Sequence, residues 1–478
     1  MYLYTIPEIF MEKTMKPIKS LLQSKLNIII LIIIASISLI TVYFNIKQHV
    51  FSLKILFLEM ASIASILFLL YAMTWKTNNK MNLLLFIFSV TFSIYTLELA
   101  LFLFFPFADN ATLAISNIAN IAKNQGIKDF DARTKIQVVQ DIRKKGINAY
   151  PSIHPDMLFD PEKIMWDCQD IFPLAGISNT HTVFCNESGK YITYQSDEHG
   201  FNNKQGLYKS STKIDIALIG DSFTQGSCIM PEHNFSGNLM KHSFNVLNFG
   251  NGGSGPLFEY AIFKEYVTVI KPKVVLWFYY QNDMDDLLKE QRVPILAKYY
   301  TEDQFSQKLL SKQNTIDSAL KTYIDKKISQ YKGSTGINAE SIFKLWELRS
   351  RMGLLCKQDS FEKKTSHELE KIFSNIMSKT QQAISTWDGH FVFIYLPGHY
   401  AFSSNNKNHH NMIMNIINRL GIGYIDIFDF LSDHPDPLSL FPFRLPLHYN
   451  EEGYRLISDE IVRYLKTHFF SNKRDNPD

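Results

Sequence analysis

The chain of 478 residues has little cysteine and almost no charge imbalance, and each shortage excludes a class of protein. Four cysteines in 478 residues exclude a small scaffold held together by disulfides. Basic residues (49) nearly balance acidic ones (46), and no basic run is interleaved with aromatic residues, so we expect no nucleic-acid partner. No Cys/His pair has the spacing of a zinc site, and we expect neither a metal nor another cofactor.

Long apolar runs are present, and they lie before residue 107. Runs at about 26–44, 55–75 and 81–105 each have the ~19–25 residues that a helix needs to cross a hydrocarbon core of ~30 Å. A signal peptide would be shorter and would not be followed by two further runs. The pattern predicts a membrane anchor over residues 1–106, with three transmembrane helices in a lipid bilayer. The lone acid of the third run, Glu98, either has a function or faces neighbouring helices.

Lysine placement predicts the orientation of this anchor. Four lysines precede the first run, and Lys76 and Lys80 separate the second from the third. Only Lys47 and Lys54 lie between the first and the second. The positive-inside rule then places the N-terminus in the cytoplasm and everything after residue 107 across the membrane. The natural start can be Met1 or Met15, because residues 1–14 have no clear structural role.

An exported domain can carry disulfides, because the compartment beyond the membrane is oxidising. Cys168 and Cys185 flank a short loop-like segment and can close a disulfide there, although a sequence does not determine connectivity. We expect Cys228 to be a packed core thiol.

Residues 213–470 alternate between short apolar runs and helical patterns, whereas residues 107–212 read as an exported linker and N-terminal extension. Expected strands are 214–219, 244–249, 274–279, 391–396 and 423–427, and expected helices are 234–242, 257–270, 367–387, 409–420 and 451–469. The alternation predicts an α/β fold of three layers, a parallel sheet with helices on both faces. Residues 284–387 are too long for one crossover, so we expect a helical insertion over the carboxyl edge of the sheet, where substrate-selecting elements often arise.

Four polar motifs follow the expected strands or open the last helix. They are Gly220-Asp221-Ser222, the glycine-rich stretch 248–255, Gln281-Asn282-Asp283, and the stretch 448–454. Because the carboxyl ends of parallel strands meet at one edge of a sheet, we expect these motifs to lie together. Taken singly, each has an ordinary alternative, such as a flexible turn at 250–255 or a helix N-cap at Asn282.

Taken together, the motifs resemble the four blocks of the SGNH/GDSL hydrolase superfamily, which is named for their Ser, Gly, Asn and His. The resemblance covers about 213–470 and implies an SGNH-type, flavodoxin-like fold. It also implies a serine esterase in which Ser222 attacks an ester carbonyl and His448 takes its proton. The backbone N–H groups of Ser222 and Gly253 and the side-chain amide of Asn282 would form the oxyanion hole.

Two positions depart from the family pattern. Tyr280 stands where the family has glycine, and Leu445 replaces the aspartate expected three residues before His448. Either a Ser–His dyad operates, or another acid orients the imidazole, and without one catalysis would be weak or absent. The candidates for that acid are Asp283, Asp436 and Glu451, with Asp221 as a further supporting group.

Stretches 194–203, 264–273 and 441–454 also look like a subgroup of bacterial membrane-linked SGNH proteins. Together with the three apolar runs and the lysine placement, that resemblance predicts a multi-pass protein of the inner (cytoplasmic) membrane with a periplasmic C-terminal domain. We expect it to act on ester-linked acyl groups, above all O-acetyl, of an envelope glycan or lipid, by hydrolysis or by acyl transfer through the same acyl-enzyme. Transfer would need a partner membrane acyltransferase, because three spans cannot readily form an acyl-CoA channel. The alternatives are a catalytically silent glycan-binding or assembly subunit, and a lipase or phospholipase.

Overall fold

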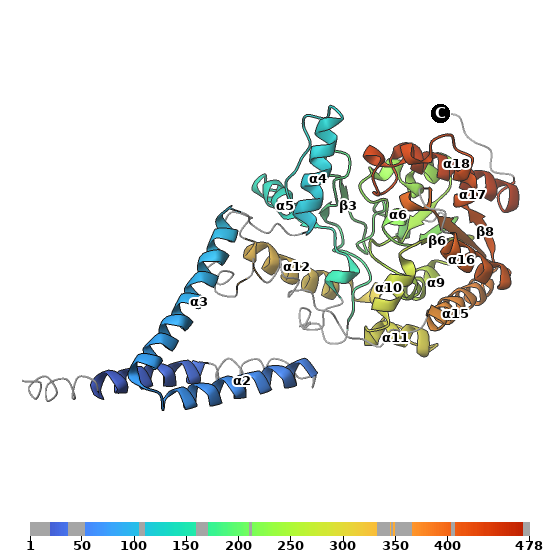
Figure 1. The fold of residues 1–478 in the computed structure, drawn as a ribbon. Coiled ribbons are helices and arrows are strands. Elements are labelled where there is room, and N and C mark those ends of the chain that lie inside the picture. The colour runs from blue at the N-terminus through green and yellow to red at the C-terminus, as the bar shows by residue number, and fades with distance from the viewer. Residues whose placement is uncertain are drawn as a thin grey trace, which may run out of the picture. The chain divides into compact units, whose positions relative to one another are not determined.

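The computed structural model describes residues 20–36, 53–104, 110–158, 171–209, 213–331, 345, 348, 366–402 and 407–471 (Figure 1). Cys168 lies outside the described residues. The chain divides into two compact units, one of Met1–Phe107 with Ile337–Gln358, and one of Ala108–Gly336 with Asp359–Asp478.

The first unit consists of apolar helices. Besides residues 20–36, these are α2 (Leu53–Ala72) and α3 (Thr77–Phe104). Within the described residues, one helix, Thr77–Leu101, is long and apolar enough to cross a membrane, with a mean hydropathy of 1.9, and Ser20–Ser36 and Ser62–Ala72 are shorter. Residues 37–44, the end of the first expected span, lie outside the described part. The three-span anchor therefore stays a prediction.

The lone acid of the third apolar run has a structural partner inside this unit. Glu98 is fully buried, and its carboxylate accepts the backbone N–H of Leu348 at 2.8 Å. A buried acid needs such a donor, because a carboxylate without one is costly to bury. This contact favours a structural role for Glu98 over a functional one.

The second unit is built on a five-stranded parallel sheet in the order β5-β4-β6-β7-β8. Its strands are β4 (Ile216–Ile219), β5 (Val246–Asn248), β6 (Val274–Tyr280), β7 (His390–Leu396) and β8 (Gly423–Asp426). β4 and β5 are buried at every position, as expected for parallel strands with helices on both faces. The expected α/β fold with a parallel sheet is confirmed.

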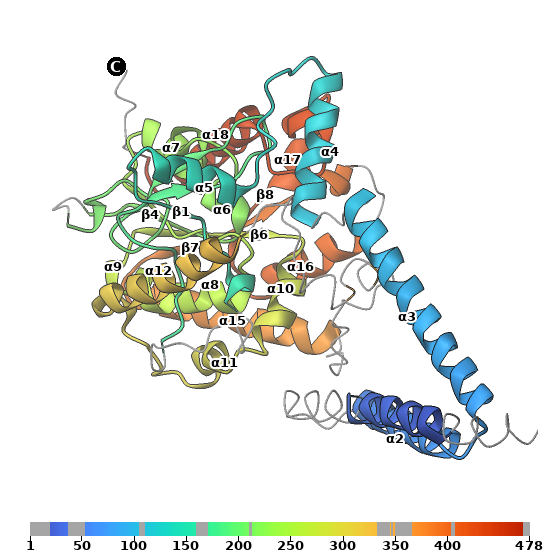
Figure 2. The same cartoon turned by 90° about the vertical axis from the view of Figure 1, so that its left-hand side faces the viewer.

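Successive strand residues point to opposite faces of the sheet, and each face packs on its own helices. Ile216, Leu218 and Leu276 belong to one apolar cluster, whereas Ala217 and Trp277 belong to another. Figure 2 shows α7 and α18 on one side of the sheet and α8 and α15 on the other. The helices around the sheet are α7 (Phe235–Lys241), α8 (Pro256–Ile262), α9 (Thr268–Ile270), α15 (Ser366–Ser385), α16 (Asn408–Arg419), α17 (Ile427–Ser432) and α18 (Glu451–His468).

The N-terminal extension belongs to the same compact unit as the sheet. It holds α4 (Asn110–Asn124), α5 (Lys135–Lys144) and a small sheet of β1 (Ala149–Pro151), β2 (His181–Val183) and β3 (Thr193–Gln195). The insertion holds α10 (Asp283–Glu290), α11 (Pro294–Thr301) and α12 (Gln313–Gln330). Asp317 of α12 accepts both the backbone N–H and the hydroxyl of Ser178, at 2.9 and 2.6 Å. The insertion is therefore bonded to the extension.

Candidate active site

Ser222 stands at the carboxyl edge of the sheet because the chain turns sharply after β4. Gly220 has φ +153°, and a Cβ there would lie 2.9 Å from the carbonyl oxygen of Phe278, so only glycine fits the turn. The short helix α6 (Ser222–Gln225) begins directly behind it. Asp221 caps this helix by accepting the backbone N–H of Phe223 at 2.9 Å. The turn thus holds the Ser222 hydroxyl in place.

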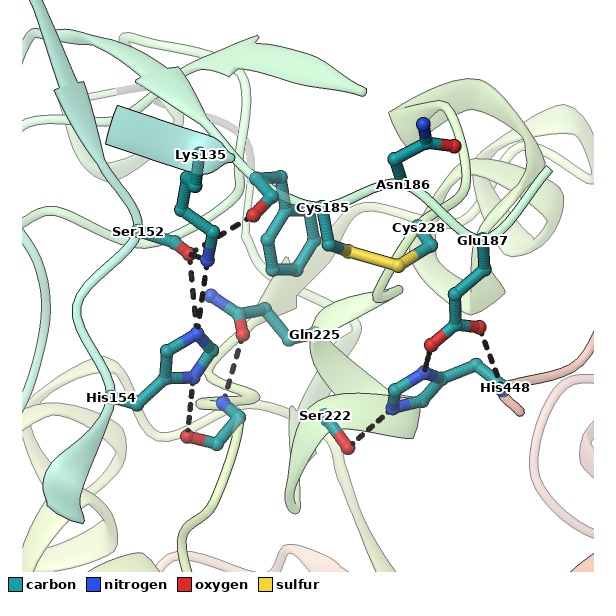
Figure 3. Close-up of a disulfide and its surroundings, with 12 residues drawn as sticks. Lys135, Ser152, His154, Cys185, Asn186, Glu187, Ser222, Gln225, Cys228 and His448 are labelled. Atoms are coloured by element: carbon teal, nitrogen blue, oxygen red, sulfur yellow. Dashed lines mark hydrogen bonds and ion pairs between the residues drawn. A yellow bond between two sulfur atoms is a disulfide. The ribbon is translucent and has the colours of Figure 1, made fainter. Parts of the chain in front are cut away.

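His448 reaches Ser222 from a distant part of the chain. It lies just before α18, whose N-cap Asn450 accepts the backbone N–H of Gly453 at 3.0 Å. The next residue, Tyr449, donates its hydroxyl to the carbonyl of Pro397 and so ties this segment to the end of β7. His448 Nε2 lies 2.8 Å from Ser222 Oγ (Figure 3). That is the hydrogen-bond distance that a serine nucleophile and a general base would need.

The carboxylate of Glu187 holds His448 from the other side. Its Oε1 lies 2.7 Å from His448 Nδ1, and its Oε2 accepts the backbone N–H of His448 at 2.9 Å. Glu187 comes from the turn between β2 and β3, 261 residues away in the sequence. The structure therefore supplies the acid that Leu445 removes from the usual position, and it supplies it from the N-terminal extension.

The acids that we expected to orient His448 do not have that role, because both ring nitrogens already face Ser222 and Glu187. Asp436 forms an exposed ion pair with Arg444, at 2.6 and 2.9 Å. Asp283 is buried and accepts the backbone N–H of Tyr280 at 3.0 Å. Glu451 is exposed in the first turn of α18. Since a carboxylate partner is present, the expected alternative of an unsupported Ser–His dyad is wrong as well.

A disulfide fixes the turn that carries Glu187. Cys185 is bonded to Cys228, six residues beyond Ser222, as Figure 3 shows. Asn186 Nδ2 donates to the carbonyl of Asp131, and its Oδ1 accepts the N–H of Gly189, both at 2.8 Å. This bond excludes the pairing of Cys185 with Cys168 that the sequence allowed, and the expectation that Cys228 is a packed core thiol was wrong. Folding places the two halves of the actual bond together, and their spacing in the sequence does not reveal it.

Neighbouring charges shift the pKa of His448. Burial alone lowers the pKa of His448, but the charge and hydrogen bond of Glu187, together with the charge of Asp221, outweigh it and raise the pKa above its usual value. Burial raises the pKa of Asp221 to about 6. Glu187 thus favours the imidazolium that forms when His448 accepts a proton.

The glycine-rich turn after β5 lies against the Ser222 turn. Asn251 donates its backbone N–H to the carbonyl of Gly220 at 3.0 Å, and the Ser254 hydroxyl donates to the same carbonyl at 3.3 Å. Gly253, whose N–H is an expected oxyanion donor, has φ +80°, a conformation that glycine adopts without strain. The second motif is therefore held beside the first.

Asn282, the expected third donor, lies at the start of α10 and gives one amide hydrogen to Asp286 Oδ2 at 2.7 Å. An amide nitrogen carries two hydrogens, so the second remains to be used. Tyr280, which stands where the family has glycine, stacks on Phe223 with ring centroids 4.3 Å apart. The ring centroids of Phe223 and His448 lie 4.7 Å apart, so Tyr280 supports the packing beside the imidazole.

Comparisons with known proteins give structural neighbours only. No protein-family model matches the chain, and neither does any curated protein sequence. The lipase/acylhydrolase from Enterococcus faecalis is 13% identical with a TM-score of 0.31, and the match covers 55% of this chain and 100% of that one. The acetyl xylan esterase AlAXEase is 15% identical with a TM-score of 0.29, and the match covers 53% of this chain and 100% of that one. A two-domain esterase (CEX) active on acetylated mannans is 14% identical with a TM-score of 0.31, and the match covers 56% of this chain and 52% of that one. Values this low carry no argument about activity.

The strand order and the motifs of the chain itself are more informative about its fold than these matches. Its strand order β5-β4-β6-β7-β8 is the flavodoxin-like order, and Ser222, the Gly253 turn and His448 meet at the carboxyl edge in the sequence of the four motifs. The second unit therefore has a flavodoxin-like α/β fold, as the resemblance to SGNH/GDSL hydrolases implies. Glu187 lies beside His448, where that resemblance leads one to expect an acid.

The candidate site offers one cluster of potential metal ligands among the described residues. Glu187, Cys228 and His448 place one ligand atom each within 4.8 Å of one another. Metals bind the thiolate form of cysteine, and the Cys228 sulfur is committed to the disulfide. We assign no metal to this cluster.

A cavity of about 340 Å³ adjoins the candidate site at the carboxyl ends of β6, β7 and β8. Its wall includes Asn282 and Gln281 from the third motif, aromatic rings of Tyr395, Tyr400 and Phe428, and the imidazole of His409. Tyr400 is 57% exposed. The wall therefore combines flat apolar faces with hydrogen-bonding groups.

We expect loss of the disulfide to impair the site. In the double variant Cys185→Ser/Cys228→Ser, the Glu187 turn loses its covalent link, and kcat/KM for an acetyl ester is expected to fall at least ~10-fold, because a mispositioned triad acid weakens the base. Thermal unfolding should also occur at lower temperature, since closing a loop of this length stabilises by ~4 kcal/mol. The measurements are ester kinetics and a melting curve. Cys168→Ser is the control; if it reproduces the loss, the pairing is a different one.

Proposed function

We propose that this chain is a membrane-anchored serine esterase of SGNH type, acting on ester-linked acyl groups, O-acetyl above all, of an envelope glycan. The continuous hydrogen-bonded chain from Ser222 through His448 to Glu187, at 2.8 and 2.7 Å, carries the proposal. The absence of an acid at Leu445 was the reason to consider a silent binding subunit. Because Glu187 supplies an acid beside His448, that reason no longer holds.

The geometry supports an acyl-enzyme mechanism. Ser222 Oγ attacks the ester carbonyl as its proton passes to His448 Nε2, and Glu187 stabilises the resulting imidazolium. The N–H groups of Ser222 and Gly253, with the second amide hydrogen of Asn282, stabilise the oxyanion. His448 then protonates the leaving alcohol, and the acyl group stays on Ser222.

A second nucleophile completes the cycle. Either water or a glycan hydroxyl gives its proton to His448 and takes the acyl group from Ser222, so hydrolysis and transfer differ only in the acceptor. Transfer to a glycan would require an acyl donor, which a partner membrane acyltransferase would supply.

The cavity beside Asn282 supports a glycan substrate over a long-chain lipid. Sugar rings present apolar C–H faces that stack on aromatic rings and hydroxyls that need hydrogen-bonding partners, and Tyr400, Gln281 and His409 provide both. A lipase would instead need a long apolar channel for its acyl chain.

The disulfide supports an exported position for the second unit. Structural disulfides persist in oxidising compartments such as the bacterial periplasm and are rare in the cytosol. Cys185–Cys228 therefore agrees with the orientation inferred from the lysines, with the N-terminus in the cytoplasm and the second unit in the periplasm. Thr77–Leu101 would be one of the spans of the anchor.

Labelling and a chain-length series test the proposal on the full chain in detergent. A fluorophosphonate probe is expected to label Ser222, because its hydroxyl lies 2.8 Å from His448, which Glu187 holds from the other side. Nitrophenyl esters of increasing acyl length should show the highest kcat/KM at acetyl. An optimum at long chains would identify a lipase, and a protein that never labels would be a silent subunit.

A further inference from the structure

Behind the glycine-rich turn lies a polar network that the mechanism above does not use. The Lys135 ammonium donates to Ser152 Oγ at 2.8 Å and lies 3.5 Å from His154 Nε2 (Figure 3). Ser152 Oγ is itself 3.2 Å from His154 Nε2. All three residues belong to the N-terminal extension, and the network ends at Gly252, whose carbonyl oxygen lies 2.9 Å from His154 Nδ1.

These contacts determine which nitrogen of His154 carries the proton. A carbonyl oxygen can only accept, so Nδ1 must donate to Gly252. Nε2 faces an ammonium and a hydroxyl, both of which can donate to it, so it acts as the acceptor of a neutral ring. Burial lowers the pKa of His154 to about 4, which keeps the imidazole neutral at physiological pH.

The bond to Gly252 also sets the direction of the next N–H. The carbonyl of Gly252 and the N–H of Gly253 belong to one planar peptide, and the described residues contain no cis peptide, so the two groups point in opposite directions. Gln225 Oε1 accepts the N–H of Gly252 at 2.8 Å and holds the preceding peptide. A Cβ at Gly252 would lie 2.8 Å from His154 Nδ1, so only glycine allows this approach. The Gly253 N–H therefore points away from His154.

We propose that His154 is a positioning residue that aims the Gly253 N–H into the oxyanion hole, with Lys135 and Ser152 holding its tautomer. The inference rests on the proposed esterase function. It gives the N-terminal extension a second task, since the same segment that supplies Glu187 to the base also orients a donor for the oxyanion.

Two substitutions at one position test this role in the full chain in detergent. His154→Phe fills the space of the ring without a donor, whereas His154→Asn places an amide nitrogen near the position of Nδ1. Loss of an oxyanion donor costs ~10²–10³ in kcat, so a misaimed donor should cost ~10–100-fold. We expect His154→Phe to lower kcat for an acetyl ester by that factor with KM unchanged, and His154→Asn to recover most of it.

Counting active sites separates positioning from folding. Fluorophosphonate titration gives the fraction of competent enzyme, and kcat is expressed per labelled site. A purely structural role would lower the labelled fraction and the melting temperature and leave kcat per site unchanged, which would overturn the inference. Equal decreases of kcat in His154→Phe and His154→Asn would overturn it too. So would a change in KM with kcat unaffected.

The tautomer gives a readout that needs no turnover. In ¹⁵N spectra of histidine-labelled full chain, the signal that disappears in His154→Asn should show a protonated Nδ1 and an unprotonated Nε2. The opposite tautomer would overturn the inference. If the wild-type protein neither labels nor hydrolyses esters, the proposed function fails, and this measurement still decides whether His154 holds Gly252.

Discussion

Replacing Ser222 with alanine is expected to lower kcat for acetyl ester hydrolysis by ~10⁴–10⁶, because the attacking oxygen is lost while binding contacts and oxyanion donors remain. Fluorophosphonate labelling should disappear with it. The fold should persist, since Ser222 opens α6 and its cap is formed by Asp221, which the substitution leaves in place. Steady-state kinetics on nitrophenyl acetate and a labelling gel measure both effects.

Ser227→Ala is the matched control for this experiment. Ser227 lies five residues further along and is buried, but His448 Nε2 faces Ser222. The control should label and turn over like the wild type. Undiminished turnover by Ser222→Ala would exclude the serine mechanism altogether.

Replacing Glu187 with glutamine should have the next largest effect, a loss of ~10²–10⁴ in kcat. Glutamine has nearly the same shape, but it has an NH₂ group in place of one of the two oxygens that face Nδ1 and the backbone N–H of His448, so one of these donors loses its acceptor. Its NH₂ group would favour the tautomer with the proton on Nε2, which cannot accept the proton of Ser222. Ester kinetics, with a circular dichroism spectrum to confirm folding, measure the loss.

The same variant should change the pH profile in a defined direction. His448 must be neutral to act as a base, so kcat/KM falls as the pH drops through its pKa. Although burial lowers this pKa, Glu187 and Asp221 raise it above its usual value. Without Glu187 the pKa falls, and the acid limb of the profile should move to lower pH while the maximum decreases.

Asp436→Asn is the matched control, because Asp436 is one of the acids that the sequence suggested. Its carboxylate pairs with Arg444 on an exposed surface, so activity should stay within about twofold of the wild type, as is usual for exposed pairs of small energy. A collapse in Asp436→Asn alongside normal turnover in Glu187→Gln would show that the acid has been misassigned.

Local sequence patterns predicted the sheet and two parts of the site. Runs such as 214–219 and 274–279 have the length and apolar content of buried parallel strands, and β4 and β6 lie there. Because strands in one parallel sheet end at a common edge, the motifs behind them had to lie near one another. Ser222 and His448 indeed lie 2.8 Å apart, although their catalytic roles remain proposals.

Pairings between distant segments could not be predicted in this way. Glu187 and Cys185 lie in a loop-rich stretch without periodicity, and no strand or helix pattern indicates that the turn between β2 and β3 reaches the loop before α18. The one local signal for the acid was the Cys-Asn-Glu sequence at 185–187, in which a cysteine lies two residues from a carboxylate. It becomes informative only when Cys228 is known to be its partner.

The sequence alone thus determined the alternation of strands and helices, the apolar N-terminal region, and the nucleophile and base candidates at the sheet edge. Each of these follows from residue pattern and strand order within short stretches of chain. Only the tertiary structure decided which acid supports His448, which cysteines pair, and that His154 contacts Gly252. Those contacts join residues tens to hundreds of positions apart, and they form only when the extension packs against the sheet.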